Sequence, residues 1–241
     1  MPQVGLMLYT VREECARDFE GTLRGVAEMG YEGVEVFSLH DHEPQAIAAV
    51  TEELGLPVVA RHARLEAIED DLDGLAAEAQ VLGWNRLVLS FIDPDTVGDP
   101  ALPGRLADAA RAAAARGLAF GFHNHWAEVV PGDAGAPFVD RLDPAIFLEV
   151  DLGWVWWAGE DPVALVERHA GRVPLVHVKD FRTRGERTFC PVGDGAIDWS
   201  TIVPAAVAAG AEWLLAEQDQ SDGPALEAAR RSLAALRAVA A

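Results

Sequence analysis

The sequence is poor in cysteine and in positive charge. Its 241 residues include two cysteines, Cys15 and Cys190, which cannot build a disulfide framework. Lysine and arginine together number 19 against 39 aspartates and glutamates, so the formal charge is −20. A chain this acidic repels nucleic-acid phosphates and anionic membrane surfaces at long range. We therefore expect neither nucleic acid nor a membrane as a partner.

Long apolar runs are also lacking, and we expect no leader peptide. No segment approaches the roughly 18 consecutive apolar residues of a membrane-spanning helix. The first residues, Met1–Gly5, do not combine a basic segment with an apolar one. Half of the residues are hydrophobic and 24% are charged, which is ordinary globular composition. These features predict a soluble protein of the reducing cytoplasm.

Lysine is almost absent. Of the 19 basic residues, 18 are arginine, and Lys179 is the single lysine. One explanation is the chance survival of a surface lysine. The other is that this position needs a compact, titratable ammonium group that a guanidinium fork cannot replace. Composition alone leaves both explanations open.

Apolar and helical segments alternate along the whole chain. Short runs rich in β-branched residues precede longer stretches with helical spacing, which is the pattern of repeated βα units. The eight expected strands are Val4–Tyr9, Gly33–Phe37, Pro57–Arg61, Arg86–Leu89, Ala119–His123, Ile146–Val150, Leu175–Val178 and Trp213–Glu217. The expected helices are Phe19–Met29, Pro44–Leu54, Asp71–Leu82, Pro103–Arg116, Pro162–His169, Trp199–Ala209 and Pro224–Val239. This order predicts an α/β protein with a single (β/α)8 TIM barrel.

Glycines mark the ends of the expected helices. Those in position to adopt the left-handed conformation after a helix are Gly30, Gly55, Gly83, Gly117, Gly171 and Gly210. No linker rich in Gly, Ser or Pro divides the chain, so residues 1–241 are expected to form one domain. An open doubly wound sheet would carry a glycine-rich phosphate loop after its first strand, but Leu8–Arg12 stands there.

Residue types that bind metals gather where the expected strands end. The active site of a TIM barrel forms at these carboxyl ends. The polar residues there are Glu35, His62, His123, Asn124, His125, Glu128, Asp151, His177, Lys179, Asp180 and Glu217. Taken singly, a histidine is more often structural, and Asp151 could cap the next helix. Their convergence at one end of consecutive strands favours a functional site.

This mixture of carboxylates and imidazoles suits a divalent ion with open coordination positions. Mn²⁺, Co²⁺, Zn²⁺ and Mg²⁺ all accept such ligands. The absence of a Cys pair argues against a closed structural zinc site. Nucleophilic serine catalysis has little support, because neither Ser38 nor Ser90 lies in a nucleophile-elbow motif.

The chain resembles the xylose-isomerase-like TIM barrels grouped as sugar phosphate isomerases/epimerases, which include inosose dehydratases and an apurinic endonuclease branch. The segments that carry the resemblance are Leu8–Arg12, Gly30–Glu35, Gly121–Glu128, Asp151–Trp154, His177–Asp180, Gly193–Asp198 and Glu217–Asp219. They cover nearly the whole chain. The resemblance is closest to the inosose dehydratase-like branch.

The resemblance implies a metal held by a Glu, an Asp, a His and a second Glu. Asp151, His177 and Glu217 match the last three of these ligands. The first is predicted to be Glu128, with His123 as the alternative, because the family's glutamate position in the fifth strand is occupied here by His123 or its neighbours. The sequence leaves the choice among Mn²⁺, Co²⁺, Zn²⁺ and Mg²⁺ open.

The remaining strand-end residues receive roles in catalysis and substrate binding. His125 and Glu217 are the candidate acid/base groups, and Lys179 would hold a substrate oxygen or stabilise a developing enolate. The residues predicted to contact substrate are His62, His123, Asn124, Glu35, Arg12 and Trp154. Trp154 would pack against a sugar ring.

The resulting hypothesis is a metal-dependent isomerase, epimerase or dehydratase. It would remove a proton next to the carbonyl of a sugar, keto-sugar or cyclitol, through a metal-stabilised enediolate. One alternative is a non-catalytic polyol-binding barrel or a subunit of a larger complex. A less favoured one is an abasic-site endonuclease, because the acidic chain offers no basic groove. A homo-oligomer is compatible with the sequence, although no apolar stripe marks an interface.

Overall fold

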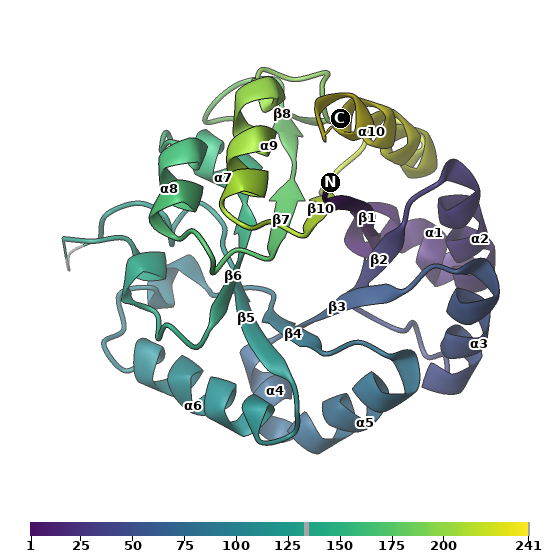
Figure 1. The fold of residues 1–241 in the computed structure, drawn as a ribbon, viewed down its shortest axis with the longest axis horizontal. Coiled ribbons are helices and arrows are strands. Elements are labelled where there is room, and N and C mark those ends of the chain that lie inside the picture. Colours follow the sequence, from purple (N-terminus) through teal and green to yellow (C-terminus); the bar gives the residue numbers. More distant parts are fainter. Residues whose placement is uncertain (133–134, 241) are drawn as a thin grey trace.

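The computed structural model of the protein describes residues 1–132 and 135–240. Its centre is a closed barrel of parallel strands (Figure 1). The barrel strands are β1 (Gln3–Met7), β2 (Gly33–Val36), β3 (Val58–Ala63), β4 (Arg86–Leu89), β5 (Ala119–His123), β6 (Phe147–Asp151), β7 (Leu175–Val178) and β10 (Trp213–Ala216). Each strand pairs with its neighbours in chain order, and β10 closes the ring against β1. The predicted (β/α)8 barrel is confirmed.

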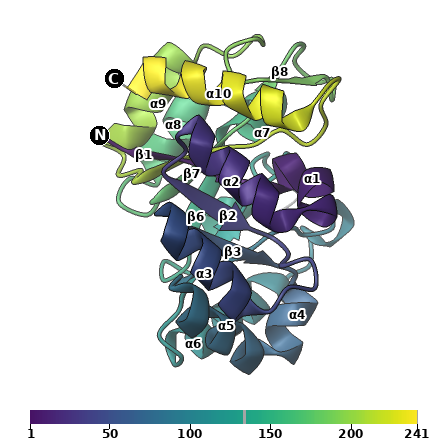
Figure 2. The same cartoon turned by 90° about the vertical axis from the view of Figure 1, so that its right-hand side faces the viewer.

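Helices surround the barrel on its outside (Figures 1 and 2). The α-helices are α1 (Arg12–Arg17), α2 (Phe19–Met29), α3 (Pro44–Leu54), α4 (Leu65–Asp70), α5 (Leu72–Leu82), α6 (Leu102–Ala114), α7 (Leu152–Trp157), α8 (Pro162–Arg168), α9 (Trp199–Ala208) and α10 (Ala225–Ala240). Short 3-10 turns are η1 (Leu8–Val11), η2 (Pro94–Thr96) and η3 (Phe138–Arg141). Among the described residues, no helix has both the length and the apolar character needed to cross a bilayer.

The predicted element boundaries agree closely with the structure. The helices Phe19–Met29 and Pro44–Leu54 begin and end as expected, and all the glycines expected after helices have a positive φ. Three short helices, α1, α4 and α7, and the antiparallel pair β8 (Asp180–Phe181) with β9 (Phe189–Cys190) were not expected. Segments of two to six residues are too short to display a helical or strand period.

The lower half of the barrel interior is filled by apolar side chains. The residues of this plug are Val59, Ala60, Val88, Leu175, Trp213 and Leu215, with Phe147 packed against them. Two glycines make room for its large rings. A Cβ atom on Gly33 would lie 2.7 Å from the Trp213 ring, and one on Gly121 would lie 2.3 Å from the Phe147 ring. Polar chemistry is therefore confined to the upper half of the interior.

Asp180 fixes the loop that borders the barrel top after β9. Its buried carboxylate accepts hydrogen bonds from the backbone N–H of Phe181 at 2.9 Å, the N–H of Gly193 at 2.9 Å and the indole N–H of Trp199 at 3.0 Å. The neighbouring Lys179 makes its contacts with carboxylates of the barrel interior. These two adjacent residues thus serve different parts of the structure.

Candidate active site

A cavity of about 580 Å³ opens at the carboxyl ends of the barrel strands. It is lined by Met7, Tyr9, Phe37, His62, Ala63, Arg64, Ser90, Phe91, His123, His125, Trp126, Trp154, Arg187, Glu217 and Asp219. The lining combines aromatic rings with imidazoles and carboxylates. Such a lining suits a small ligand that carries both an apolar face and several oxygen atoms.

Four buried side chains meet at the floor of this cavity, and we call them the upper cluster. They are His123, Asp151, His177 and Glu217. One potential ligand atom from each lies within 4.8 Å of those of the other three. The parallel register places Asp151 beside His177, and β5 and β10 bring in the other two. The structure therefore brings together three of the predicted ligands and the alternative first ligand, His123.

Asp151 has two roles because its two oxygens face different groups. Its Oδ1 accepts a hydrogen bond of 2.8 Å from the backbone N–H of Trp154 and so caps helix α7. Its Oδ2 is buried and, among the described residues, accepts no well-aligned hydrogen bond, although Lys179 Nζ lies 3.1 Å away. Burial raises the pKa of Asp151 to about 6. Capping and ion binding are thus compatible at this residue.

Lys179 is the internal countercharge of the site. Its side chain is 1% exposed, and its Nζ lies 3.1 Å from Asp151 Oδ2, 2.8 Å from Glu217 Oε2 and 2.8 Å from Asp219 Oδ1. Lys179 is not a surface lysine, and it does not line the cavity. The predicted contact between Lys179 and substrate is therefore not what this geometry provides, because three carboxylates already surround the ammonium.

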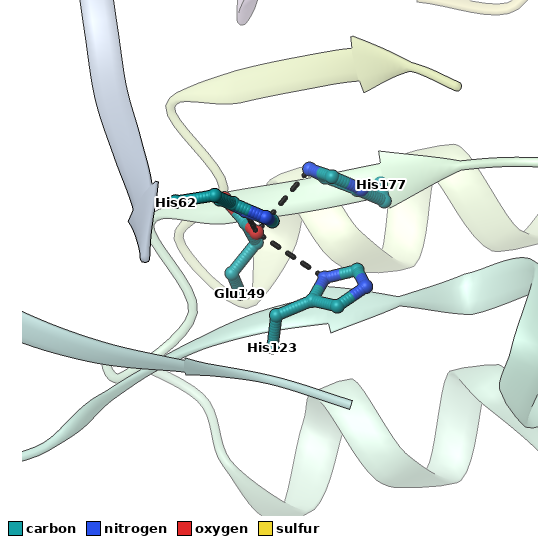
Figure 3. A group of neighbouring side chains, drawn as sticks. All are labelled: His62, His123, Glu149 and His177. Carbon is teal, nitrogen blue, oxygen red and sulfur yellow. Dashed lines mark hydrogen bonds and ion pairs between the residues drawn. The ribbon is translucent and has the colours of Figure 1, made fainter. Parts of the chain in front are cut away.

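A second group of side chains overlaps the upper cluster and extends deeper into the barrel, and we call it the lower cluster. It consists of His62, His123, Glu149 and His177 (Figure 3). The Oε2 atom of Glu149 lies 2.6 Å from His62 Nε2, 3.2 Å from His123 Nδ1 and 3.2 Å from His177 Nε2. Glu149 precedes Asp151 by two residues on the same face of β6, which explains its greater depth.

Glu35 reaches the lower cluster from β2. Its Oε2 lies 2.6 Å from His177 Nε2, and its Oε1 lies 3.2 Å from His62 Nε2. Burial opposes the charging of an imidazole, but Glu35 and Glu149 outweigh it and raise the pKa of His62 to about 9. The same carboxylates, with Glu217, raise the pKa of His177 well above its ordinary value despite its burial. Protonated imidazoles thus balance the buried carboxylates when no other cation is present.

His125 is a neutral imidazole on the cavity wall. Burial, assisted by the charge of Lys179, lowers the pKa of His125 to about 3. Its Nδ1 has no hydrogen-bond partner among the described residues. The ring lies edge-on to Phe91, with 5.3 Å between the two ring centroids. The His125 ring is therefore uncharged at neutral pH, and its Nδ1 is not engaged by another described residue.

Glu217 is a buried carboxylate that its positive neighbours keep ionised. Burial alone would raise its pKa, but the charges of Lys179 and His177 outweigh burial and hold the pKa of Glu217 well below its ordinary value. Its Oε2 lies 2.9 Å from His177 Nδ1. This ionised carboxylate is held by His177 and Lys179 and is placed to bind a cation, which leaves His125 as the candidate for the acid/base role.

Glu128 lies outside both clusters, and the geometry does not support its prediction as the first metal ligand. Its side chain is fully buried, but its Oε2 turns back to accept a hydrogen bond of 3.0 Å from the backbone N–H of His125. The residue belongs to the loop after β5, whereas His123 is the last residue of that strand and faces the barrel interior. Of the two candidates for the first ligand, the alternative His123 is the one that belongs to the upper cluster.

We expect Glu128→Gln to retain the metal content of the wild type and His123→Ala to lower it. Elemental mass spectrometry of both purified variants would check this expectation. Loss of the ion from the Glu128 variant alone would restore Glu128 as a ligand.

The same Glu128 variant has a pH-dependent effect on stability. Burial raises the pKa of Glu128 to about 7 from its ordinary 4.5. Between these values the native state holds a proton that the unfolded state has released, so stability falls as pH rises through this window. Glu128→Gln should therefore gain stability relative to wild type, by up to about 3 kcal/mol above pH 7. Thermal unfolding at pH 5 and pH 8 would measure the change.

Three residues predicted to contact substrate lie away from the cavity. Asn124 is buried and accepts a hydrogen bond of 3.1 Å from the backbone N–H of Asp151, so it joins the ends of β5 and β6. Arg12 stacks on the Tyr9 ring at 4.3 Å and donates to the Tyr9 carbonyl. Glu35 is fully buried beneath the cavity floor. His62, His123 and Trp154 do line the cavity.

Glu149 and Asp219 escaped the sequence prediction as separate functional candidates. A signal for Glu149 was present, because it is an acidic residue inside an otherwise apolar strand, two positions before Asp151. Residues two apart in a strand share a face. Asp219 similarly follows Glu217 by two positions, and its carboxylate contacts Lys179. The i, i+2 rule applied to Asp151 and Glu217 would have found both residues.

The curated relatives include a rhizopine catabolism protein and several inosose dehydratases. The rhizopine catabolism protein MocC of Rhizobium meliloti is 32% identical over 142 residues, which are 50% of this chain and 43% of that protein. The match therefore spans less than half the length of that relative. An inosose dehydratase of Geobacillus kaustophilus is 25% identical over 246 residues, covering 82% of this chain and 79% of that enzyme.

Solved structures share the fold over nearly the whole chain. A sugar phosphate isomerase/epimerase from Parabacteroides distasonis superposes with a TM-score of 0.81 at 20% identity, covering 98% of this chain and 94% of that one. The IolI protein, in a structure with a zinc atom, has a TM-score of 0.76 at 16% identity and covers 99% and 98% of the two chains. A family model described as xylose isomerase-like TIM barrel matches residues 23–239. The chain therefore belongs to the xylose isomerase-like TIM barrel family.

Proposed function

We propose that this protein is a divalent-metal-dependent isomerase, epimerase or dehydratase that removes a proton next to the carbonyl of a sugar, keto-sugar or cyclitol. One observation carries the proposal: the imidazole of His125, whose Nδ1 has no hydrogen-bond partner among the described residues, lines the same cavity as His123 and Glu217 of a buried cluster of metal-ligand residues. The names of the relatives, inosose dehydratase among them, support this substrate class.

The donor set of the upper cluster fits a divalent ion. His123 and His177 offer ring nitrogens, and Asp151 and Glu217 offer carboxylate oxygens, of which Asp151 Oδ2 lacks an aligned partner within the described part of the chain. Borderline ions such as Mn²⁺, Co²⁺ and Zn²⁺, and also Mg²⁺, accept such ligands. When bound, the ion supplies a Lewis acid that stabilises negative charge on a carbonyl oxygen. The IolI structure with zinc supports the same assignment.

The charge of the surroundings also favours a cation. Five buried or half-buried carboxylates face this region, and they belong to Glu35, Glu149, Asp151, Glu217 and Asp219. Lys179 is the single ammonium group among them. A divalent cation would offset the remaining negative charge in a region with little water, where unpaired carboxylates are costly.

The other cavity residues position and deprotonate the substrate. Trp126 and Trp154 form an aromatic wall, with ring centroids 5.1 Å apart, against which the apolar face of a sugar or cyclitol ring can pack. His125 stands beside this wall, 5.9 Å from Trp154 between ring centroids, and accepts the proton from the carbon next to the carbonyl. Return of the proton to the neighbouring carbon gives isomerisation, and its return to the same carbon from the opposite face gives epimerisation. Loss of a β-hydroxyl gives dehydration.

Deuterium exchange tests the shared first step whatever the final product. We expect the ion-loaded protein to incorporate solvent deuterium next to the carbonyl of an inosose or keto-sugar in D₂O, as followed by proton NMR. His125→Ala should slow this exchange by about 10²–10⁴-fold while retaining the ion, because it removes only the proton acceptor. Exchange by the variant at the wild-type rate would rule out His125 as the base. No exchange with any member of either substrate class would contradict the proposed function.

A further inference from the structure

Glu35 lies in a position that has no direct use in binding substrate. It is fully buried inside the barrel, directly above the apolar plug, and contributes nothing to the cavity wall. Its carboxylate contacts two imidazoles, those of His177 at 2.6 Å and His62 at 3.2 Å. Burying a carboxylate is costly unless its partners offset the lost hydration. The charge of Glu35 inside the barrel therefore acts on its imidazole partners and not on substrate.

His177 is held between two carboxylates on opposite sides of its ring. Its Nε2 faces Glu35 below at 2.6 Å, and its Nδ1 faces Glu217 above at 2.9 Å. A neutral imidazole has one N–H and one lone pair, so a hydrogen bond at one nitrogen determines what the other can do. An N–H directed down to Glu35 leaves the Nδ1 lone pair facing the upper cluster.

We propose that Glu35 is a positioning residue that fixes the tautomer and orientation of His177, so that Nδ1 can bind the divalent ion; this inference rests on the proposed function. The negative charge of Glu35 also makes Nδ1 a stronger donor to a cation, as carboxylates behind metal-binding histidines do. Glu35 acts through His177 and touches neither substrate nor ion.

Glu149 gives a second support to the same layer. Its Oε2 lies 3.2 Å from His177 Nε2 and 3.2 Å from His123 Nδ1, and both imidazoles belong to the upper cluster (Figure 3). Two carboxylates from β2 and β6 thus stand behind the two imidazoles of the upper cluster. Glu35 makes the shorter contact with His177, so it is the residue to test first.

Glu35→Gln removes the charge and keeps the shape of the side chain. We expect the affinity for Zn²⁺ or Co²⁺, measured by competition with a chromophoric chelator, to fall about 10–100-fold. In the zinc-loaded protein with ¹⁵N-labelled histidine, the Nε2–H proton of His177 should move upfield in the variant, because its bond to a carboxylate is lost. Glu128→Gln is the matched control: it neutralises another buried carboxylate, and it should change neither the affinity nor this signal.

The outcomes separate this inference from the proposed function. If wild type and Glu35→Gln bind the ion equally tightly, the role of Glu35 is overturned and the proposed metal site stands. If the wild type binds none of Mn²⁺, Co²⁺, Zn²⁺ and Mg²⁺, the role of Glu35 and the proposed metal site are both overturned. Should Glu35→Gln fail to fold, Glu35→Asp keeps the charge but withdraws the carboxylate from His177. It should bind the ion at least about tenfold more weakly, and wild-type affinity would again overturn the inference.

Discussion

Replacing His177 by alanine should abolish ion binding and slow deuterium exchange into substrate by about 10³-fold or more. His177 is fully buried and belongs to both clusters, so no other side chain can take its place. Its loss also leaves Glu35 without its closest partner. Elemental mass spectrometry and the exchange assay would measure the two effects on one preparation.

The control for this variant is the same substitution at an exposed histidine. His42 stacks on Phe19 at the outer surface, 5.5 Å between ring centroids, and takes no part in either cluster. His42→Ala should therefore keep both the ion and the rate. A His177→Ala protein that retains one ion per chain would show that the upper cluster is not the binding site.

Lys179→Met should give the largest loss of stability of the substitutions considered. It removes a buried ammonium and leaves Asp151, Glu217 and Asp219 facing one another without it. Breaking a buried ion pair in this way costs about 3–5 kcal/mol, and for a chain of this size that is roughly 6–20 °C in Tm. Thermal unfolding in the presence of chelator would measure the loss.

Two conditions should reduce the loss of stability that Lys179→Met causes. Saturating divalent ion returns positive charge to the carboxylates, so the difference in Tm from wild type should shrink when the ion is present. Lowering the pH protonates carboxylates such as Asp151, whose pKa burial already raises to about 6, and should have the same effect. An unchanged Tm in chelator at pH 8 would contradict the role of Lys179 as countercharge.

Lys179→Arg would show why arginine has not replaced this lysine. The ammonium is 1% exposed and contacts three carboxylates within 3.1 Å. A planar guanidinium is larger and cannot occupy this position without displacing them. We therefore expect Lys179→Arg to be less stable than wild type even though the charge is kept.

The alternation of strands and helices was readable from the sequence because each barrel unit is long enough to display its period. Strands such as Arg86–Leu89 and Leu175–Val178 were located to the residue, and glycines after helices marked the turns. The upper cluster was also largely predictable, since Asp151, His177 and Glu217 all occur where a strand ends. The position of a residue at the end of a strand indicates its level along the barrel axis.

The depth of a side chain in the barrel and the direction in which it points were harder to predict. Glu128 and His123 are five positions apart, and only the course of the loop after β5 shows that one carboxylate turns to the backbone while the other residue faces the interior. Glu35 was expected on the cavity wall, but the bulge in pairing between β2 and β3 accompanies a deeper placement. Register between neighbouring strands sets this depth, and a single sequence does not reveal it.

Asp151 connects the stability of helix α7 with the occupancy of the upper cluster, because it takes part in both. One carboxylate oxygen of Asp151 caps helix α7, and the residue also belongs to the upper cluster, where we propose that the ion binds. Helix α7 carries Trp154, which forms part of the cavity wall. Because such couplings are reciprocal, a change that strengthens ion binding through Asp151 also stabilises the first turn of α7. Fraying of that turn, in the same way, lowers the affinity for the ion. Under the proposed function, binding of the ion and the shaping of the cavity wall are therefore one equilibrium.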